Sequence, residues 1–151
     1  MISTIMINND NSFIWKEEYS VGIHEIDKQH KEIFTLVNDL SQLCAIDDTK
    51  SYGTFKIMLS SAMEYFENHF WEEEKYMQEK NYPMYSEHKN EHGTMLREIK
   101  EMAVKIGKDE TITINIITSY LKEWYMAHFF GADKEMGDYF RKVVNPACSG
   151  T

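Results

Sequence analysis

Seven side chains that commonly bind metal ions are spaced along this chain of 151 residues at intervals typical of helices. They are His30, His69, Glu73, His88, His92, His128 and Asp133. The pairs His69/Glu73 and His88/His92 are four residues apart, so each pair lies on one face of an α-helix, one turn apart. All five histidines fall on the apolar stripe of a predicted helix, where a buried imidazole requires a partner. A shared metal centre would provide one for all of them.

Hydrophobic periodicity predicts the helices that position these residues, over residues 27–44, 51–80, 84–106, 113–129 and 134–144. Asn81 and Pro83 are expected to end the second helix. The apolar stripe of the third helix is predicted to continue through Ile99 and Ala103 to Ile106. Residues 111–116 alternate in β-branched side chains and would alone favour a strand, but we expect tertiary packing to make residues from 113 helical.

Short connections between long amphipathic helices favour an all-α fold, an antiparallel up-down-up-down four-helix bundle with a short C-terminal helix. We expect an N-terminal arm (1–14), one domain (15–144) and a C-terminal tail (145–151). The candidate ligands lie near the starts of the first and third helices and near the ends of the second and fourth. In an antiparallel bundle these four places lie at the same end, so the ligands are predicted to meet in the core.

Asp133 follows His128 by five residues, which places the two about 140° apart on an unbroken α-helix. Gly131 between them is expected to break the helix and turn the carboxylate inward. Seven donor groups are more than the four ligands that a structural zinc ion takes. Five of the seven are nitrogen donors, whereas calcium and magnesium prefer oxygen. Two six-coordinate metals fit better, and with a bridging oxygen they leave one of about twelve positions open. Iron, manganese, cobalt and zinc all suit these donors. The Glu-x-x-His spacing of ferritin-like di-iron bundles is absent from the sequence, which disfavours that class of bundle.

From about Trp15 to Tyr139 the chain resembles the single-domain bacterial hemerythrins. The matching segments are Val21-Gly22-Ile23, Ile26-Asp27-Lys28-Gln29-His30, His69-Phe70-Trp71-Glu72-Glu73, Glu87-His88-Lys89-Asn90-Glu91-His92 and His128-Phe129-Phe130-Gly131-Ala132-Asp133. The resemblance implies reversible dioxygen binding at two iron ions (Fe2+/Fe3+) with a bridging oxo or hydroxo group. It implies His88, His92 and His128 on one iron. It also implies His30 and His69 on the other, which holds the open position, with Glu73 and Asp133 as bridges.

Six residues next to the ligands are predicted to form an apolar oxygen pocket that slows autoxidation. They are Ile33, Phe34, Phe70, Trp124, Tyr125 and Phe129. Tyr125 departs from the family, which usually has an aliphatic residue there. If its hydroxyl faces the bound dioxygen, we expect faster protonation and faster autoxidation.

Several other residues are interpreted as ordinary structural or surface groups. Glu72 and Glu74 are expected to be solvated, and His24 to lie on the surface before the first helix. Trp15 is expected to pack the arm against the bundle, with contact to a ligand access path as the alternative. The two cysteines, Cys44 and Cys148, are interpreted as inert thiols.

A formal net charge of −9 argues against nucleic acid and anionic membranes as partners. Apolar runs are too short for a membrane span, and the first residues lack a secretory pattern, so a cytoplasmic location is expected.

We expect a non-catalytic oxygen carrier or store, with sensing as a less favoured role. Its partners would be O2, with NO or small anions as other ligands, and an oxidase or membrane enzyme as recipient of O2. A monomer or weak oligomer is expected. The alternatives are a di-iron redox enzyme (a peroxidase, an oxidase or a protein that handles nitric oxide) and an iron buffer or metal-stabilised scaffold.

Overall fold

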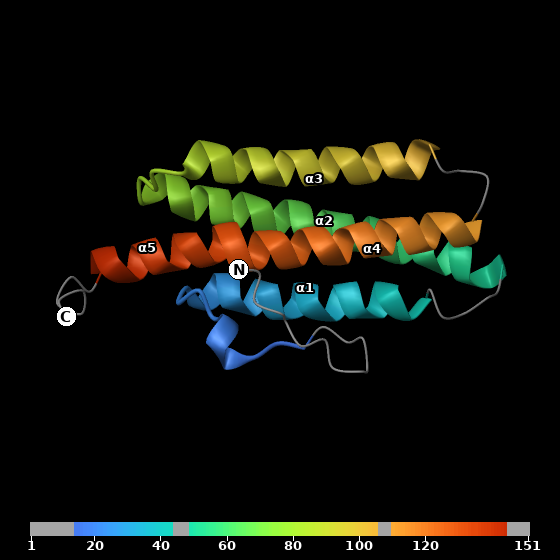
Figure 1. Cartoon of the computed structure of the whole chain (residues 1–151), viewed down its shortest axis with the longest axis horizontal. Helices are drawn as coiled ribbons and strands as arrows, with labels where there is room; N and C mark the ends of the chain where they lie inside the picture. Colours follow the sequence, from blue (N-terminus) through green and yellow to red (C-terminus); the bar gives the residue numbers. More distant parts are fainter. Residues whose placement is uncertain (1–13, 44–48, 106–109, 145–151) are drawn as a thin grey trace, which may run out of the picture.

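A computed structural model describes residues 14–43, 49–105 and 110–144 (Figure 1). The helices are α1 (His24–Leu43), α2 (Thr49–Glu79), α3 (Tyr85–Lys105), α4 (Glu110–His128) and α5 (Lys134–Val144). A 3-10 turn, η1 (Glu17–Tyr19), precedes α1, and a π-helical turn, η2 (Phe129–Asp133), joins α4 to α5. The described residues contain no strand. The predicted all-α four-helix bundle with a short C-terminal helix is confirmed.

The four long helices form a closed square in which α1 and α3 occupy opposite corners. α1 packs against α2 and α4, and α3 packs against the same two helices (Figure 1). Each helix turns one apolar stripe inward, as Ile33, Phe34, Val37 and Leu40 do on α1, where all four side chains are buried. α4, η2 and α5 follow one another along a single line, so α5 extends the bundle beyond the start of α1.

The bundle core has two apolar parts. The larger part follows the four helices and includes Phe66 and Leu121. The smaller part closes the end near the α2–α3 connection and consists of Met77, Tyr82, Met136 and Phe140. The buried polar side chains His69 and Glu73 lie on α2 between Phe66 and Met77, and therefore between these two parts. A polar layer thus separates two apolar layers.

Most predicted helix boundaries lie within three residues of the observed ones, and the differences have physical causes. α1 begins at His24, which is exposed but is the first residue of the helix and does not precede it. α4 begins at Glu110, so the β-branched segment is helical from its start, and Ile114 and Ile117 are buried in the core. Ala103 is exposed, so the buried stripe of α3 ends at Ile99 within the described residues, and Ile106 lies outside them.

The connection between α2 and α3 follows the prediction. Asn81 adopts a left-handed φ of 53°, and the amide of Tyr82 donates to the carbonyl oxygen of Met77 at 2.9 Å, which ends α2. The predicted positions of Cys44 and Cys148, and those of the arm up to residue 13 and the tail from 145, lie outside the described residues.

The segment at the start of α1 (residues 20–27) packs against α5 (residues 137–141), and we call these contacts the terminal clamp. The amide of Val21 donates to Asp27 Oδ1 at 2.8 Å, and Arg141 Nη2 donates to the carbonyl oxygen of Ser20 at 3.0 Å. A Cβ on Gly137 would lie only 2.5 Å from Val21 O, so the close approach of the two segments requires glycine there.

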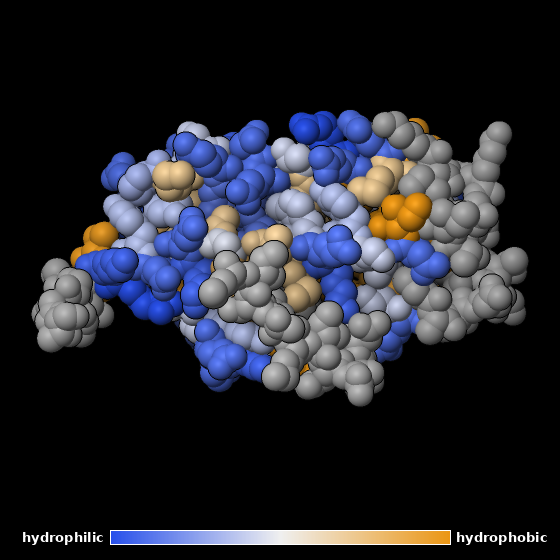
Figure 2. Space-filling model, viewed as in Figure 1, coloured by the Kyte–Doolittle hydropathy of each residue, from blue (hydrophilic) through white to orange (hydrophobic). Residues whose placement is uncertain are grey.

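On the face shown in Figure 2, hydrophilic residues predominate and hydrophobic residues form small separate patches. None of the helices, over the residues that the structure describes, combines the length and the apolar character required to cross a bilayer.

Candidate metal centre

The structure brings all seven predicted ligand residues into the polar layer. α1 provides His30, α2 provides His69 and Glu73, α3 provides His88 and His92, and α4 with η2 provides His128 and Asp133. None of the seven is more than 3% exposed. The antiparallel arrangement therefore does bring the starts of α1 and α3 and the ends of α2 and α4 together at one end of the bundle.

The π-helical turn η2 explains the five-residue spacing between His128 and Asp133. The amide of Lys134 donates to the carbonyl oxygens of Gly131 and Phe129, so the helix widens without ending. In a π-turn, residues five apart lie on one face, and His128 Nε2 lies 2.9 Å from Asp133 Oδ1. The predicted break at Gly131 is therefore wrong, and its φ is not positive.

The donor atoms fall into two overlapping groups that could each hold a metal ion. The three-histidine subsite consists of His88, His92, His128, Glu73 and Asp133. The two-histidine subsite consists of His30, His69, Glu73 and Asp133. Glu73 Oε2 and Asp133 Oδ1 face the first group, whereas Glu73 Oε1 and Asp133 Oδ2 face the second. Each carboxylate therefore presents one oxygen to each subsite.

Donor separations differ between the subsites. In the three-histidine subsite, His88 Nε2 lies 3.0 Å from Asp133 Oδ1 and 3.2 Å from Glu73 Oε2, and His92 Nε2 lies 3.2 Å from Glu73 Oε2. In the two-histidine subsite, His30 Nε2 lies 3.2 Å from Asp133 Oδ2, but Glu73 Oε1 lies 3.7 Å from His30 Nε2 and 3.9 Å from His69 Nε2. Neighbouring donors around a six-coordinate metal are about 3.0 Å apart when metal–donor bonds are about 2.1 Å. The three-histidine subsite is close to that spacing.

The hydrogen bonds of the imidazoles test whether a cation fits between them. His92 Nδ1 lies 3.0 Å from Glu74 Oε1, and His128 Nδ1 lies 2.7 Å from Glu91 Oε2. Because carboxylates accept, both Nδ1 atoms carry the proton, which leaves the Nε2 lone pairs facing the cluster. These two Nε2 atoms are 3.0 Å apart, and such lone pairs repel unless a cation lies between them. The donor set therefore fits a metal ion.

Several inward donor atoms at the centre are buried without a hydrogen bond within the described chain. They are His30 Nε2, His69 Nε2, Glu73 Oε1, Asp133 Oδ1 and Asp133 Oδ2. Burial alone would raise the pKa of Glu73, but His69, His30 and the neighbouring imidazoles hold it well below its ordinary value. Burial lowers the pKa of His69 to about 3, which keeps its ring neutral. Ionised carboxylates and a neutral imidazole are the forms that bind metals.

Three residues that contact the ligands from outside were not predicted: Gln29, Glu74 and Glu91. His69 Nδ1 donates to Gln29 Oε1 at 2.8 Å, as His92 and His128 donate to the two carboxylates. Glu74 was expected to be solvated, which is wrong, because its side chain is only 17% exposed and is bound by His92 and by Lys89. All three are polar residues directly beside a candidate ligand in sequence, which is the signal that could have identified them.

The six predicted pocket residues do not surround a single subsite. Phe129 and Tyr125 contact His30, with ring centroids 4.8 and 6.4 Å away, and Phe34 packs against both of these aromatic rings. Trp124 and Phe70 lie on the other side. The ring of Trp124 stacks on His128 at 4.5 Å, and Phe70 stacks on His92 at 3.9 Å. Ile33 is fully buried in the larger core.

Trp15 covers the aromatic side of the two-histidine subsite. Its ring lies 5.6 Å from that of Phe34 and 6.0 Å from that of Phe129, and the side chain is half-buried. The expectation that Trp15 packs the N-terminal segment against the bundle agrees with these contacts. Contact of Trp15 with a ligand access path stays a prediction.

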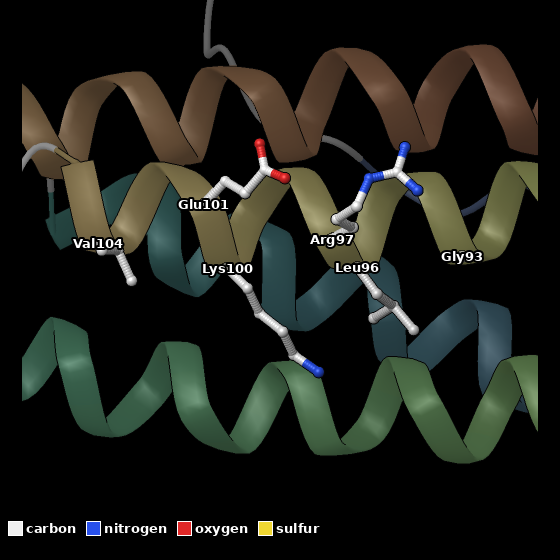
Figure 3. A pocket seen from close by; sticks show the side chains of 6 residues that line it. All are labelled: Gly93, Leu96, Arg97, Lys100, Glu101 and Val104. Carbon is white, nitrogen blue, oxygen red and sulfur yellow. The ribbon is translucent and has the colours of Figure 1, made fainter.

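Two surface hollows differ in their relation to the cluster. A cleft of about 580 Å³ is lined by Glu91, Trp124 and His128 among others, and so reaches a candidate ligand. A second hollow, of about 530 Å³, lies on α3 and is lined by Gly93, Leu96, Arg97, Lys100, Glu101 and Val104 (Figure 3). Lys100 points toward α2, where its Nζ lies 3.1 Å from Glu67 Oε1. No candidate ligand lines this second hollow.

Comparison with known proteins gives the family. The sequence model described as the Hemerythrin HHE cation binding domain matches residues 21–140, which is most of the chain. The chain belongs to the hemerythrin family. The matched segment includes every residue of the two subsites, and the earlier resemblance to hemerythrins is confirmed.

Curated relatives agree with this assignment. A bacteriohemerythrin of Clostridium acetobutylicum is 28% identical over 128 residues, which are 83% of this chain and 99% of that protein. A bacteriohemerythrin of Methylococcus capsulatus is 28% identical over 120 residues, 80% of this chain and 89% of that protein. A myohemerythrin of Theromyzon tessulatum is 28% identical over 119 residues, 79% of this chain and 86% of that protein. None of the solved structures matches significantly. Membership of the hemerythrin family implies a non-haem iron protein that binds oxygen.

Proposed function

We propose that this hemerythrin-family chain binds dioxygen reversibly at a pair of iron ions and acts as a carrier or store without catalysis. In the proposal, His88, His92 and His128 hold one ion, and His30 and His69 hold the other. Glu73 and Asp133 bridge the two ions, together with an oxo or hydroxo group. The iron pair, when bound, would supply the electrons that dioxygen binding requires.

The observation that supports the proposal best is the division of the two carboxylates between the subsites. Asp133 Oδ1 lies 2.9 Å from His128 Nε2, while Asp133 Oδ2 lies 3.2 Å from His30 Nε2. A carboxylate with one oxygen toward each of two imidazole groups is arranged to bridge two metals. The two-histidine subsite has four donors against five, so an open position belongs there.

The chain's own residues would protect that open position from water. Phe34, Tyr125 and Phe129 are each no more than 2% exposed and pack around His30, with Trp15 outside them. An apolar wall favours a small neutral ligand over water and anions, and it hinders proton delivery from solvent. These are the conditions under which oxygen binding remains reversible.

Stopped-flow absorption of the reduced, iron-loaded protein mixed with O2, combined with metal analysis, tests the proposal. A long-lived oxygenated species with two irons per chain is the expected result. Rapid conversion to the oxidised form with release of peroxide would favour the redox enzyme. Absence of any reaction would leave an iron buffer or scaffold.

The redox enzyme is retained as the second candidate because of Tyr125. This phenol is fully buried, and its ring lies 6.4 Å from that of His30. Burial raises its pKa well above the ordinary value, as do the charges of Asp133 and Glu73, so the phenol stays neutral and retains its O–H group. A cytoplasmic location, a monomeric or weakly oligomeric state, and an O2-consuming oxidase as recipient also remain proposals.

A further inference from the structure

The imidazoles of the two subsites are supported by groups of different charge. In the three-histidine subsite, His92 donates through Nδ1 to the carboxylate of Glu74, and His128 donates to that of Glu91. In the two-histidine subsite, His69 donates to the neutral amide oxygen of Gln29. His30 Nδ1 is buried and makes no hydrogen bond within the part of the chain that the structure describes.

A carboxylate behind an imidazole strengthens the metal–nitrogen bond more than an amide does, because it withdraws the Nδ1 proton and adds negative charge. Glu74 binds His92 through Oε1, while its Oε2 lies 3.2 Å from Lys89 Nζ. Glu91 binds His128 through Oε2 at 2.7 Å. Two carboxylates therefore lie behind the imidazoles of the three-histidine subsite, whereas an amide lies behind His69.

Ring packing supports the same subsite. Phe70 stacks on His92 with an interplanar angle of 8°, and Trp124 stacks on His128 with an angle of 12°. Each of these two imidazoles is thus fixed by a hydrogen bond at Nδ1 and by a stacked ring at its face. With donor separations near those of a six-coordinate metal, the three-histidine subsite requires little rearrangement to bind one.

We propose that the two halves of the cluster load in a fixed order, the three-histidine subsite first and the two-histidine subsite second. Glu74 and Glu91 are the positioning residues that set the order. The inference rests on the proposed paired metal site. At limiting metal, the chain would hold one ion among His88, His92 and His128 and keep the His30 and His69 side free. The last ion bound and the first one lost would be the ion that carries the open position.

Titration of the full-length, metal-free chain with Zn²⁺ tests this order without any redox chemistry. Nitrogen-15 NMR of the imidazoles should show shifts of His88, His92 and His128 up to one equivalent. Shifts of His30 and His69 should follow only with the second equivalent. Simultaneous shifts of all five rings, or earlier shifts of His30 and His69, would overturn the inference.

Four variants, one of them a control, distinguish the cause of the order by calorimetry. Glu74→Gln and Glu91→Gln should each weaken the first binding step by about 10–100-fold and change the second little. Glu72→Gln alters a neighbouring exposed carboxylate and should change neither step. Gln29→Glu adds a negative charge behind His69 and should strengthen the second binding step. The affinities of the two steps should therefore become more similar. Equal weakening of both steps by Glu74→Gln and Glu91→Gln would contradict the assigned role.

Loss of the fold without metal would not prevent the measurement. In that case the fully loaded chain is treated with a chelator, and the imidazoles of His30 and His69 should be released before the other three. Release in the opposite order would contradict the inference while leaving a two-metal site intact. Failure to bind any metal at all would instead refute the proposed function.

Discussion

The two-histidine subsite is enclosed by aromatic rings, whereas the three-histidine subsite is supported by ionised carboxylates next to a surface cleft. Around His30, Phe129 and Tyr125 are fully buried, and Trp15 packs on Phe129. Around His128, Glu91 has a side chain that is 51% exposed and lines the cleft of about 580 Å³. The two overlapping subsites therefore differ in their surroundings, with an apolar side and a charged, solvated side.

This difference separates two requirements of an oxygen-binding site. Firm metal binding benefits from charge, hydrogen bonds and rigid donors, which the α3 and α4 side provides. Binding of a small neutral ligand benefits from a dry apolar wall, which the α1 side provides. Glu73 and Asp133 belong to both sides and couple them.

The largest expected effect comes from removing a shared carboxylate by changing the residue count of η2. Inserting one alanine between Gly131 and Ala132 makes His128 and Asp133 six apart, which moves the carboxylate away from both subsites. The metal content, measured by metal analysis, should fall from two ions per chain to one at most. Deleting Gly131 is the matched control.

The deletion should retain both ions, because residues four apart share a face of an ordinary α-helix. No atom outside the helix lies within 4 Å of a Cβ at Gly131, so the glycine itself has no steric role there. Two ions in the insertion variant, or a lost ion in the deletion variant, would contradict the account of η2.

Metal removal should make the stability fall at alkaline pH. Burial works against protonation, but the nearby carboxylates of Asp133 and Glu73 raise the pKa of His88 to about 10 and that of His30 to about 9. These values lie above about 6.5, the ordinary pKa of histidine, so the stabilisation is complete below about pH 6.5. It is lost as the pH rises through 9 to 10.

Thermal unfolding of the metal-free chain at pH 7 and pH 10 measures this loss. For a domain of this size, each kcal/mol of lost unfolding free energy should lower the Tm by about 2–4 °C. The loaded protein is the control, since bound metal replaces the protons and should flatten the dependence. A metal-free Tm that does not change between the two pH values would refute the prediction.

Trp15→Ala tests the aromatic wall. Removing a half-buried ring that packs on Phe34 and Phe129 should cost about 1–2 kcal/mol of unfolding free energy and shorten the autoxidation half-life. Trp71→Ala is the matched control, because Trp71 is 60% exposed and should change stability by no more than about 0.5 kcal/mol. Equal autoxidation half-lives of Trp15→Ala and Trp71→Ala would show that Trp15 does not protect the site.

The smallest effect is expected from Tyr125→Phe. The substitution retains the ring against Phe34 and Phe66 and removes only the hydroxyl that could deliver a proton. Autoxidation should slow severalfold in the oxygenated protein, as followed by absorption. A half-life equal to that of the wild type would exclude a role for the hydroxyl.

Helical periodicity was sufficient to predict the bundle and the convergence of the ligands, because burial of apolar stripes fixes which face of each helix turns inward. His69 and Glu73 continue the stripe of Phe66 on α2 without a change of phase, so their inward direction followed from spacing alone. The same periodicity could not predict η2, because a five-residue interval fits an α-helix only with a break.

The supporting residues were missed for a different reason. Glu74 and Glu91 lie at the polar border of their helices, where spacing alone predicts solvent exposure. Whether such a residue meets an imidazole depends on the rotation of the neighbouring helix, since Glu74 on α2 contacts His92 on α3, and Glu91 on α3 contacts His128 on α4. Single-helix patterns do not contain that information.

The terminal clamp has a consequence for how the protein is made. It joins Ser20 and Val21, near the beginning of the chain, to Gly137 and Arg141, near its end. During synthesis Ser20 and Val21 cannot contact α5 until residues 137–141 have emerged from the ribosome. The end of the bundle that contains the candidate ligands therefore closes last, and a nascent chain that stops shortly after Asp133 would have every candidate ligand but no terminal clamp to close that end.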